Sequence, residues 1–365
     1  MYIKTLELEN FRNYKNLHID FDKGTTILYG DNAQGKTNIL EAIFYLAITK
    51  SYKGVKDKDV IYFNESESHL RAFLEKNEEP VRIDMHLRNN KAKGIALNLE
   101  KVKKAVDLLG TMNVVLFSPE DLNIIKEGPA NRRQFVDMEL CQLDSFYTYN
   151  LTNYNKIVNQ RNTLLKDIYF NPTLKETLNI WDNQMISYGS KIIERRKGFV
   201  NQLNEIIKEI HLKLSGGTEN IEIIYDPDTT IEDYEKNLNA SKERDLKSKI
   251  TSVGPHRDDF IFKVNGVDIR KFGSQGQQRT AALSLKLAEV ELVKNVTKDI
   301  PILLLDDVLS ELDSNRQNYL LDTIGNVQTI ITCTGLDEFV NDRFEVNKVY
   351  KVTNGTIEEM SNKDN

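Results

Sequence analysis

The segment Gly30-Asp31-Asn32-Ala33-Gln34-Gly35-Lys36-Thr37 fits the pattern G-x-x-x-x-G-K-[ST] at every fixed position. Glycines let such a loop curl so that its backbone N–H groups face a polyphosphate. We expect Lys36 to reach the terminal phosphates as a catalytic residue and Thr37 to ligate Mg²⁺, while the rest of the loop, with Asn38, holds the nucleotide. The sequence therefore predicts a site for ATP and Mg²⁺.

The residues on either side of this loop predict a strand before it and a helix after it. Thr25 to Tyr29 is an apolar run of strand length, and apolar residues recur at helical spacing from Ile39 to Ala47. Upstream, the segments 3–8 and 17–21 are close to the alternation that is typical of half-buried strands. The loop therefore lies at a strand-to-helix turn of an α/β fold, where a phosphate loop is expected.

The middle of the chain predicts two long helices. Apolar residues recur at three- and four-residue steps from about residue 140 to about residue 215, with Pro172 as an interruption and Ser215-Gly216-Gly217 as a stop signal. We expect these helices to pair as an antiparallel arm. Further strands are predicted after the arm, at 260–264, 267–269, 301–305 and 329–332.

Residues 301–307 form an apolar strand that ends in two carboxylates, the form of a Walker B element. We expect Asp306 to hold Mg²⁺ and Asp307 to polarise the water that attacks the terminal phosphate as a catalytic residue. The alternative is that an aspartate at the end of the strand caps the next helix. The phosphate loop favours the catalytic interpretation, because both elements serve the same chemistry.

A third motif lies at the start of the long helix that precedes this strand. Gly273-Ser274-Gln275-Gly276-Gln277-Gln278-Arg279 places small residues and free N–H groups at a helix N-terminus, where an anion can bind. The alternative is an ordinary capped helix start. We predict that Ser274, Gly276 and Gln277 contact the nucleotide.

The S-x-G-Q core of this motif resembles the signature motif of ABC-class ATPases, in which a D-loop follows Walker B. Ser310-Glu311-Leu312-Asp313 stands at the corresponding place. The resemblance implies that the signature motif of one subunit closes over the ATP of another, so that a symmetric homodimer encloses two ATP molecules.

Four segments narrow the resemblance to the RecF family, in the SMC-like branch of this class: 8–14, 128–135, 254–259 and 305–313. The family implies an ABC-type α/β head built from both ends of the chain, with an inserted helical arm. We expect the head at 1–135 and 251–365 and the arm at 136–250. By analogy with the SMC-like branch, Arg12 would contact the nucleotide; the alternative is a surface residue beside the first strand.

The same resemblance implies a weak, DNA-stimulated ATPase that acts as a switch on duplex DNA and single-strand/duplex junctions. RecR, RecO and RecA are its implied partners, with RecA loaded at single-stranded gaps. Two departures from the ABC pattern favour slow hydrolysis: Asp307 is shorter than the usual glutamate, and the switch position near 331–334 has no histidine. The remaining alternatives are a transporter-type ABC subunit and a nucleotide-independent scaffold.

The net charge of −6 opposes nucleic-acid binding unless a local face is basic. The candidate basic residues fall into three groups: Lys91, Lys93, Lys101, Lys103 and Lys104; Arg132 and Arg133; and Lys191, Arg195, Arg196 and Lys197.

Several remaining residues and segments carry weaker expectations. We expect a structural or interface role for His256 and a DNA or subunit contact for Arg257. The two cysteines, Cys141 and Cys333, have no metal-type spacing. A charged N-terminal segment and the lack of a long apolar run favour a cytoplasmic protein with no membrane partner.

Overall fold

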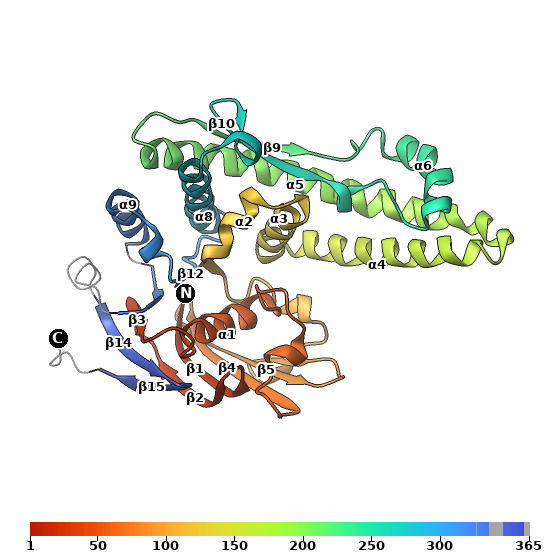
Figure 1. Ribbon diagram of the computed structural model, residues 1–365. Coiled ribbons are helices and arrows are strands. Elements are labelled where there is room, and N and C mark those ends of the chain that lie inside the picture. The colour runs from red at the N-terminus through yellow and green to blue at the C-terminus, as the bar shows by residue number, and fades with distance from the viewer. Residues whose placement is uncertain (326, 336–345, 361–365) are drawn as a thin grey trace. The chain divides into compact units, whose positions relative to one another are not determined.

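The computed structural model describes residues 1–325, 327–335 and 346–360 (Figure 1). The chain divides into two compact units, of which the first comprises Met1–Asp121 with Glu289–Asn365 and the second Leu122–Ala288. The second unit is longer than the predicted arm at 136–250 and includes the segment that carries Ser274. Both ends of the chain thus contribute to the first unit, as an ATPase head with an insertion requires.

The first unit contains a six-stranded antiparallel sheet in the order β2-β1-β4-β5-β6-β7. Its inner face is apolar because buried Leu6 and Leu8 alternate with Glu7 and Glu9 along β1, the pattern of a half-buried strand. The strands are β1 (Tyr2–Phe11), β2 (Tyr14–Asp20), β4 (Glu67–Lys76), β5 (Glu79–Arg88), β6 (Gly94–Leu97) and β7 (Glu100–Lys101).

A second six-stranded sheet of this unit has the order β15-β14-β3-β13-β12-β8 and is parallel except for β15. All five residues of β12 are buried, as expected for a central parallel strand. The strands are β3 (Thr25–Tyr29), β8 (Val114–Phe117), β12 (Ile302–Asp306), β13 (Thr329–Cys333), β14 (Val346–Thr353) and β15 (Thr356–Glu359).

Helix α1 (Lys36–Ile48) contacts strands of both sheets and is buried along most of its length. The phosphate loop, which directly precedes α1, is therefore anchored to the core of the first unit. Helix α9 (Ser314–Ile324) follows β12, and its N-terminus is capped by Asp313, whose side chain accepts from the backbone N–H groups of Asn315 and Arg316.

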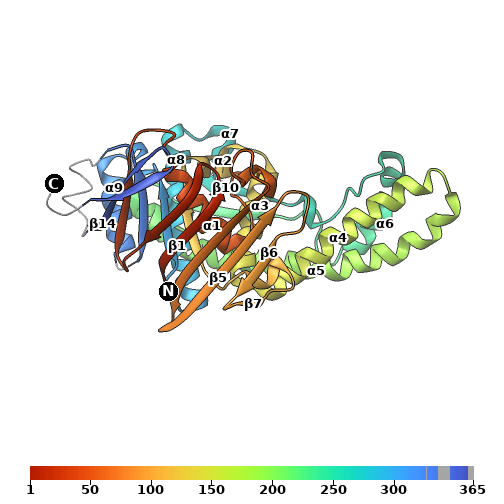
Figure 2. The same cartoon turned by 90° about the horizontal axis from the view of Figure 1, so that it is seen from below.

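The second unit is mainly helical. Helices α4 (Ser145–Ile168) and α5 (Leu178–Leu214) lie side by side in both views and confirm the predicted antiparallel pair, which is interrupted at Pro172 (Figures 1 and 2). The other helices are α2 (Leu122–Lys126), α3 (Pro129–Leu143), α6 (Tyr234–Ser248), α7 (Ile269–Phe272) and α8 (Gln275–Thr297), which continues into the first unit.

A small antiparallel sheet, β11-β10-β9, completes the second unit, with β9 (Ile221–Asp226), β10 (Asp259–Val264) and β11 (Val267–Asp268). The predicted hairpin at Asn265-Gly266 is confirmed, and both turn residues have positive φ. The prediction that its second strand reaches Ile269 is wrong, because the Asp268 side chain caps α7 by accepting from the Arg270 N–H. No helix among the described residues is long and apolar enough to cross a bilayer.

Candidate nucleotide-binding site

The phosphate loop joins β3 to α1, and its two glycines have backbone conformations that side chains rarely adopt. Gly30 has a φ of 149° and Gly35 a φ of 119°. A Cβ atom at Gly30 would clash with the Val352 carbonyl oxygen, and one at Gly35 would lie 2.5 Å from the Asn13 side chain. Ala33, between them, is left-handed at 64°. The curled backbone that the motif predicts is therefore present.

Side chains from the β1–β2 turn hold this loop in place. Asn13 donates to the Gln34 carbonyl at 2.9 Å and accepts from Asn38 at 2.8 Å, while the Tyr14 hydroxyl donates to the Gly35 carbonyl at 3.1 Å. The sequence marks this turn as a family segment but does not reveal its role, because the contact spans about twenty residues and leaves no periodic signal.

The open part of the loop is arranged for an anion. Asp31, Asn32 and Ala33 are exposed, and the first turn of α1 has no acidic residue to compete for its N–H groups. The Lys36 ammonium donates to the carbonyls of Gly30 and Asp31, the latter at 2.8 Å. A phosphate would replace these acceptors with a charged one, which strengthens the hydrogen bond.

Walker B meets the phosphate loop at Thr37. The Thr37 hydroxyl donates to the Asp306 carboxylate at 2.7 Å, across 269 residues of sequence. The Thr332 hydroxyl donates to the same carboxylate at 2.9 Å, and the Tyr52 hydroxyl donates to its other oxygen at 3.2 Å. Hydroxyl and carboxylate oxygens are the ligands that Mg²⁺ prefers, so Thr37 and Asp306 fit the predicted metal role.

Asp307 is held in an unusual backbone conformation, with a φ of 54°. Its N–H donates to the Thr332 hydroxyl at 3.0 Å. Burial raises the pKa of its carboxyl and so does the neighbouring charge of Asp306, against the opposing effects of Lys36 and Ser310. A carboxylate with a raised pKa accepts a proton from water more readily, which suits the predicted catalytic role.

Thr332 was not predicted as a site residue from the sequence, where its segment stood out only for the lack of a histidine. Strand β13 pairs with β12 so that Thr332 lies opposite Asp306. The sequence shows Thr332 only as a polar residue near the end of an apolar strand. Its role follows from the pairing of that strand with β12, which the sequence does not reveal.

Arg12 forms a two-pronged ion pair with the buried Glu41 of α1, at 3.0 Å and 2.5 Å, and also donates to the Asp59 carbonyl. Burial alone would raise the pKa of Glu41, but hydrogen bonds from Arg12 and Ser51 and the charge of Lys53 outweigh it and lower that pKa. Arg12 is thus anchored to the helix that follows the loop. Its contact with the nucleotide stays a prediction.

The signature segment lies in the second unit and forms a capping box at the start of α8. The Gln277 N–H donates to the Ser274 hydroxyl at 3.1 Å, and the Ser274 N–H donates to the Gln277 side chain at 3.0 Å. The local geometry is therefore that of a capped helix start, which was the alternative to a nucleotide contact. Ser274 and Gly276 are nevertheless exposed and accessible to a ligand.

The candidate basic residues differ in their exposure. Arg132 and Arg196 are buried in ion pairs with acidic side chains, Asp259 for Arg132 and Asp137 and Asp258 for Arg196, so they cannot present charge to DNA. Lys93 is half-buried and paired with Asp57. The exposed members are Lys91, Lys101, Lys103, Lys104, Arg195 and Lys197, while Arg133 and Lys191 are half-buried.

His256 has the structural environment that was expected. Its ring bonds the Tyr154 hydroxyl at 2.8 Å and the Thr251 carbonyl at 3.1 Å. Arg257 is exposed and donates to the same carbonyl. Cys141 and Cys333, both among the described residues, are not joined by a disulfide bond.

Comparison with known proteins supports the predicted family. The RecF/RecN/SMC N terminal domain family matches residues 2–358. The chain is 57% identical over 359 residues to the "DNA replication and repair protein RecF" of Lachnospira eligens, covering 98% of this chain and 99% of the relative. It is 59% identical over 358 residues to the protein of that name from Agathobacter rectalis, with the same coverage.

Solved structures agree with this result. A structure described as the "recombination mediator protein RecF-ATP in RecFOR pathway" is 36% identical, covers 99% of this chain and 98% of its own, and has a TM-score of 0.93. The Smc head domain of Pyrococcus furiosus, at 19% identity and a TM-score of 0.57, shares the fold. The predicted ABC-type head with a helical insertion is confirmed, and the chain belongs to the RecF family.

Proposed function

We propose that this protein is an ATP-dependent DNA-binding protein of replication and recombinational repair, and that slow ATP hydrolysis resets it. The observation that carries the proposal is the convergence of Thr37, Asp306 and Asp307 beside the phosphate loop. RecF relatives carry "DNA replication and repair" in their names, and the related solved structure is a RecF bound to ATP.

The chemistry that we assign to the site follows from its side chains. The loop N–H groups and Lys36 bind the phosphates, and Thr37 and Asp306 hold Mg²⁺, which neutralises phosphate charge when bound. Asp307 orients and deprotonates the attacking water. Because aspartate is one methylene shorter than the usual glutamate, it positions water less well, and hydrolysis is slow enough for the protein to act as a switch.

The exposed signature segment supports an ATP-dependent homodimer. Ser274 and Gly276 lie at a helix N-terminus, where the helix dipole favours a phosphate. In the dimer, this segment of one protomer would contact the ATP held by Lys36 of its partner. Binding of ATP would then close the dimer, and hydrolysis would open it.

The proposed partners follow from the family. We assign duplex DNA and single-strand/duplex junctions as ligands and RecO and RecR as partners in assisting RecA loading at single-stranded gaps, in the cytoplasm. The related RecF structure is described as a mediator in the RecFOR pathway, which supports this assignment.

The oligomeric mass, measured by light scattering with ATP and Mg²⁺ and with or without duplex DNA, tests the proposal. We expect an ATP-dependent dimer for the wild type and for Asp307→Asn, and a monomer for Lys36→Ala. Lys50→Ala removes an exposed lysine near the other end of the same helix and should behave like the wild type. A monomer under every condition would contradict the proposal and support a nucleotide-independent scaffold.

Two substitutions at Ser274 separate its capping role from its phosphate role. Ser274→Asp keeps an N-cap but sets a negative charge against the partner's phosphate, whereas Ser274→Arg loses the cap, at a cost of about 1 kcal/mol, and fills the contact surface. Both should prevent dimerisation if Ser274 contacts ATP. A Ser274→Asp protein that still dimerises would limit this residue to capping the helix.

A further inference from the structure

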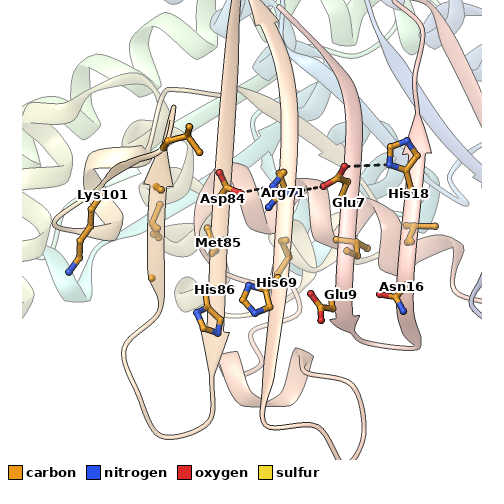
Figure 3. A pocket seen from close by; sticks show the side chains of 17 residues that line it. Glu7, Glu9, Asn16, His18, His69, Arg71, Asp84, Met85, His86 and Lys101 are labelled. Carbon is orange, nitrogen blue, oxygen red and sulfur yellow. Dashed lines mark hydrogen bonds and ion pairs between the residues drawn. The ribbon is translucent and has the colours of Figure 1, made fainter.

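The outer face of the first sheet carries a second group of functional side chains, distinct from the nucleotide site. A depression of about 680 Å³ lies over strands β1, β2, β4, β5 and β6 (Figure 3). Across its floor, the strand register places Asn16 opposite Glu9, Glu9 opposite His69, and His69 opposite His86. This row therefore brings two imidazoles and a carboxylate together on adjacent strands.

The two histidines form a close pair. Their rings stack with centroids 4.0 Å apart and planes at 18°. Glu67 lies two residues before His69 and so on the same face of β4, and its carboxylate is 2.9 Å from the His86 ring nitrogen. One ligand atom from each of Glu67, His69 and His86 lies within 4.8 Å of the other two.

We propose that Glu67, His69 and His86 bind one transition-metal ion of the Zn²⁺ class. Two imidazole nitrogens and one carboxylate oxygen suit a borderline cation, and they leave a fourth position for water. Mg²⁺ prefers oxygen ligands alone, so the site has a different selectivity from Thr37 and Asp306.

Binding one ion requires the three side chains to reorient. In a tetrahedral site with metal bonds of about 2.0–2.1 Å, neighbouring ligand atoms lie roughly 3.3 Å apart. The three ligand atoms here lie within 4.8 Å of one another, so they would have to come closer together. Rotation of the exposed Glu67 side chain and of the two rings about their side-chain bonds would bring the atoms closer, and it would open the ring stack so that both nitrogens face one ion. His69 and His86 are directly paired on neighbouring strands, so the distance between their backbones is set by the sheet before any metal binds.

The surrounding charges favour a cation. The exposed Glu67 places a carboxylate beside the His86 ring. Glu9, opposite His69, adds a second carboxylate on the same face (Figure 3). Two arginines are nearby opposing charges: Arg88, opposite Glu67 in the register, donates to the Ala92 carbonyl at 3.3 Å, and Arg71 pairs with Glu7 and Asp84.

Zinc binding to the full chain, after removal of metal with chelator and dialysis, tests the site. Competition with a zinc indicator should give one Zn²⁺ per chain, and the visible spectrum of added Co²⁺ should show tetrahedral coordination. His69→Gln and the double variant His69→Gln/His86→Gln should weaken binding at least about tenfold. His18→Gln, on the same sheet face, is the matched control and should bind as the wild type does.

Two comparisons exclude other sites and general unfolding. Asp306→Asn should leave Zn²⁺ binding unchanged, because that residue belongs to the nucleotide site. Wild-type ATP binding by the double variant would show that its fold is intact. The inference is overturned if the wild type binds no stoichiometric Zn²⁺, if the histidine variants bind as well as the wild type, or if equimolar Mg²⁺ displaces the zinc.

Discussion

At the scale of single residues, the Thr332 hydroxyl contacts both aspartates of the candidate catalytic pair, Asp306 through its carboxylate and Asp307 through its backbone. It donates to Asp306 and accepts from the Asp307 N–H, so its proton and its lone pair are both in use. A non-glycine residue with positive φ costs free energy of order 1 kcal/mol or more, and the hydrogen bond to Thr332 helps to retain Asp307 in that conformation. The position of the second carboxylate therefore depends on a neighbouring strand.

Changing the length of the carboxyl side chain at position 307 tests its catalytic role. Asp307→Glu should increase the turnover of ATP several-fold, because the longer chain brings the carboxylate closer to the water. Asp307→Asn should decrease it by about 100-fold or more, since the base is lost. Steady-state phosphate release, with ATP affinity measured in parallel, distinguishes this effect from weaker binding.

The pH dependence of hydrolysis adds a readout specific to Asp307. Because its pKa is raised in the folded protein, the acidic limb of the turnover profile should lie at higher pH than for an ordinary aspartate. Turnover should be full above this raised pKa and fall as the carboxyl is protonated. An acidic limb that remains identical in Asp307→Glu and the wild type would argue against this carboxyl as the base.

His256 should make the protein sensitive to acid. A carbonyl only accepts, so the ring nitrogen that faces Thr251 donates to it, and in the neutral ring the other nitrogen accepts from the Tyr154 hydroxyl. Burial lowers its pKa from 6.5 to about 4. The imidazole therefore binds a proton more tightly in the unfolded chain than in the folded one. The contribution of the neutral ring to folding stability is complete above pH 6.5 and is lost as the pH falls towards 4.

Thermal unfolding at pH 7 and pH 5 measures this contribution. His256→Gln should show a smaller loss of Tm between the two pH values than the wild type, because glutamine does not titrate. His18→Gln, which removes an exposed histidine, should leave the wild-type loss unchanged. Equal losses in all three proteins would assign the acid sensitivity to other groups.

At the scale of elements, the arm is joined by a buried ion-pair network as well as by apolar packing. Arg161 of α4 donates to Asp182 of α5 at 2.8 Å and to Asp245 of α6 at 2.7 Å, and all three side chains are buried. Thr251 also accepts from this guanidinium. One side chain thus fixes how three helices pack.

Removing Arg161 should destabilise the second unit strongly. Arg161→Ala removes the buried cation that Asp182 and Asp245 share, leaving Asp182 with Lys242 at 3.3 Å and Asp245 with uncharged donors. The expected cost is about 3–5 kcal/mol in unfolding free energy. Lys175→Ala breaks the exposed pair with Glu243 and should cost less than about 1 kcal/mol. Urea unfolding of both variants measures the contrast, and similar midpoints would show that the buried network contributes little.

At the scale of the whole molecule, a net charge of −6 means that the proposed binding of DNA requires a local basic surface. The exposed lysines near the end of the first sheet, Lys101, Lys103 and Lys104, form the largest exposed group of the candidates. Arg195 on the arm is exposed but already pairs with Asp144 at 3.2 Å. The lysine group is therefore better placed to release counterions from DNA.

Charge reversal should rank these two surfaces. Lys103→Glu/Lys104→Glu should weaken DNA binding and reduce the slope of log affinity against log salt by about 0.9 for each phosphate that the protein no longer neutralises. Arg195→Glu should have a smaller effect, because its charge is partly neutralised already. Fluorescence anisotropy at several salt concentrations measures both, and the reverse order would place DNA on the arm.

The sequence by itself determined the features that depend on neighbours along the chain. The strand, glycine-rich turn and helix around Lys36 follow from local backbone preferences and apolar spacing. So do the two long helices of the arm and the apolar strand that ends at Asp306. Strands β4 to β7 were not predicted, although buried residues alternate with more exposed ones along β4 and β5.

Only the tertiary structure decided which distant residues meet. Thr37 and Asp306 are 269 residues apart, and the role of Thr332 depends on β13 lying beside β12. The same holds for Arg132, whose charge is buried by a partner 127 residues away. Hydrogen bonding and desolvation act through space, so a local pattern reveals which groups are available, while the fold determines which of them are paired, buried or exposed.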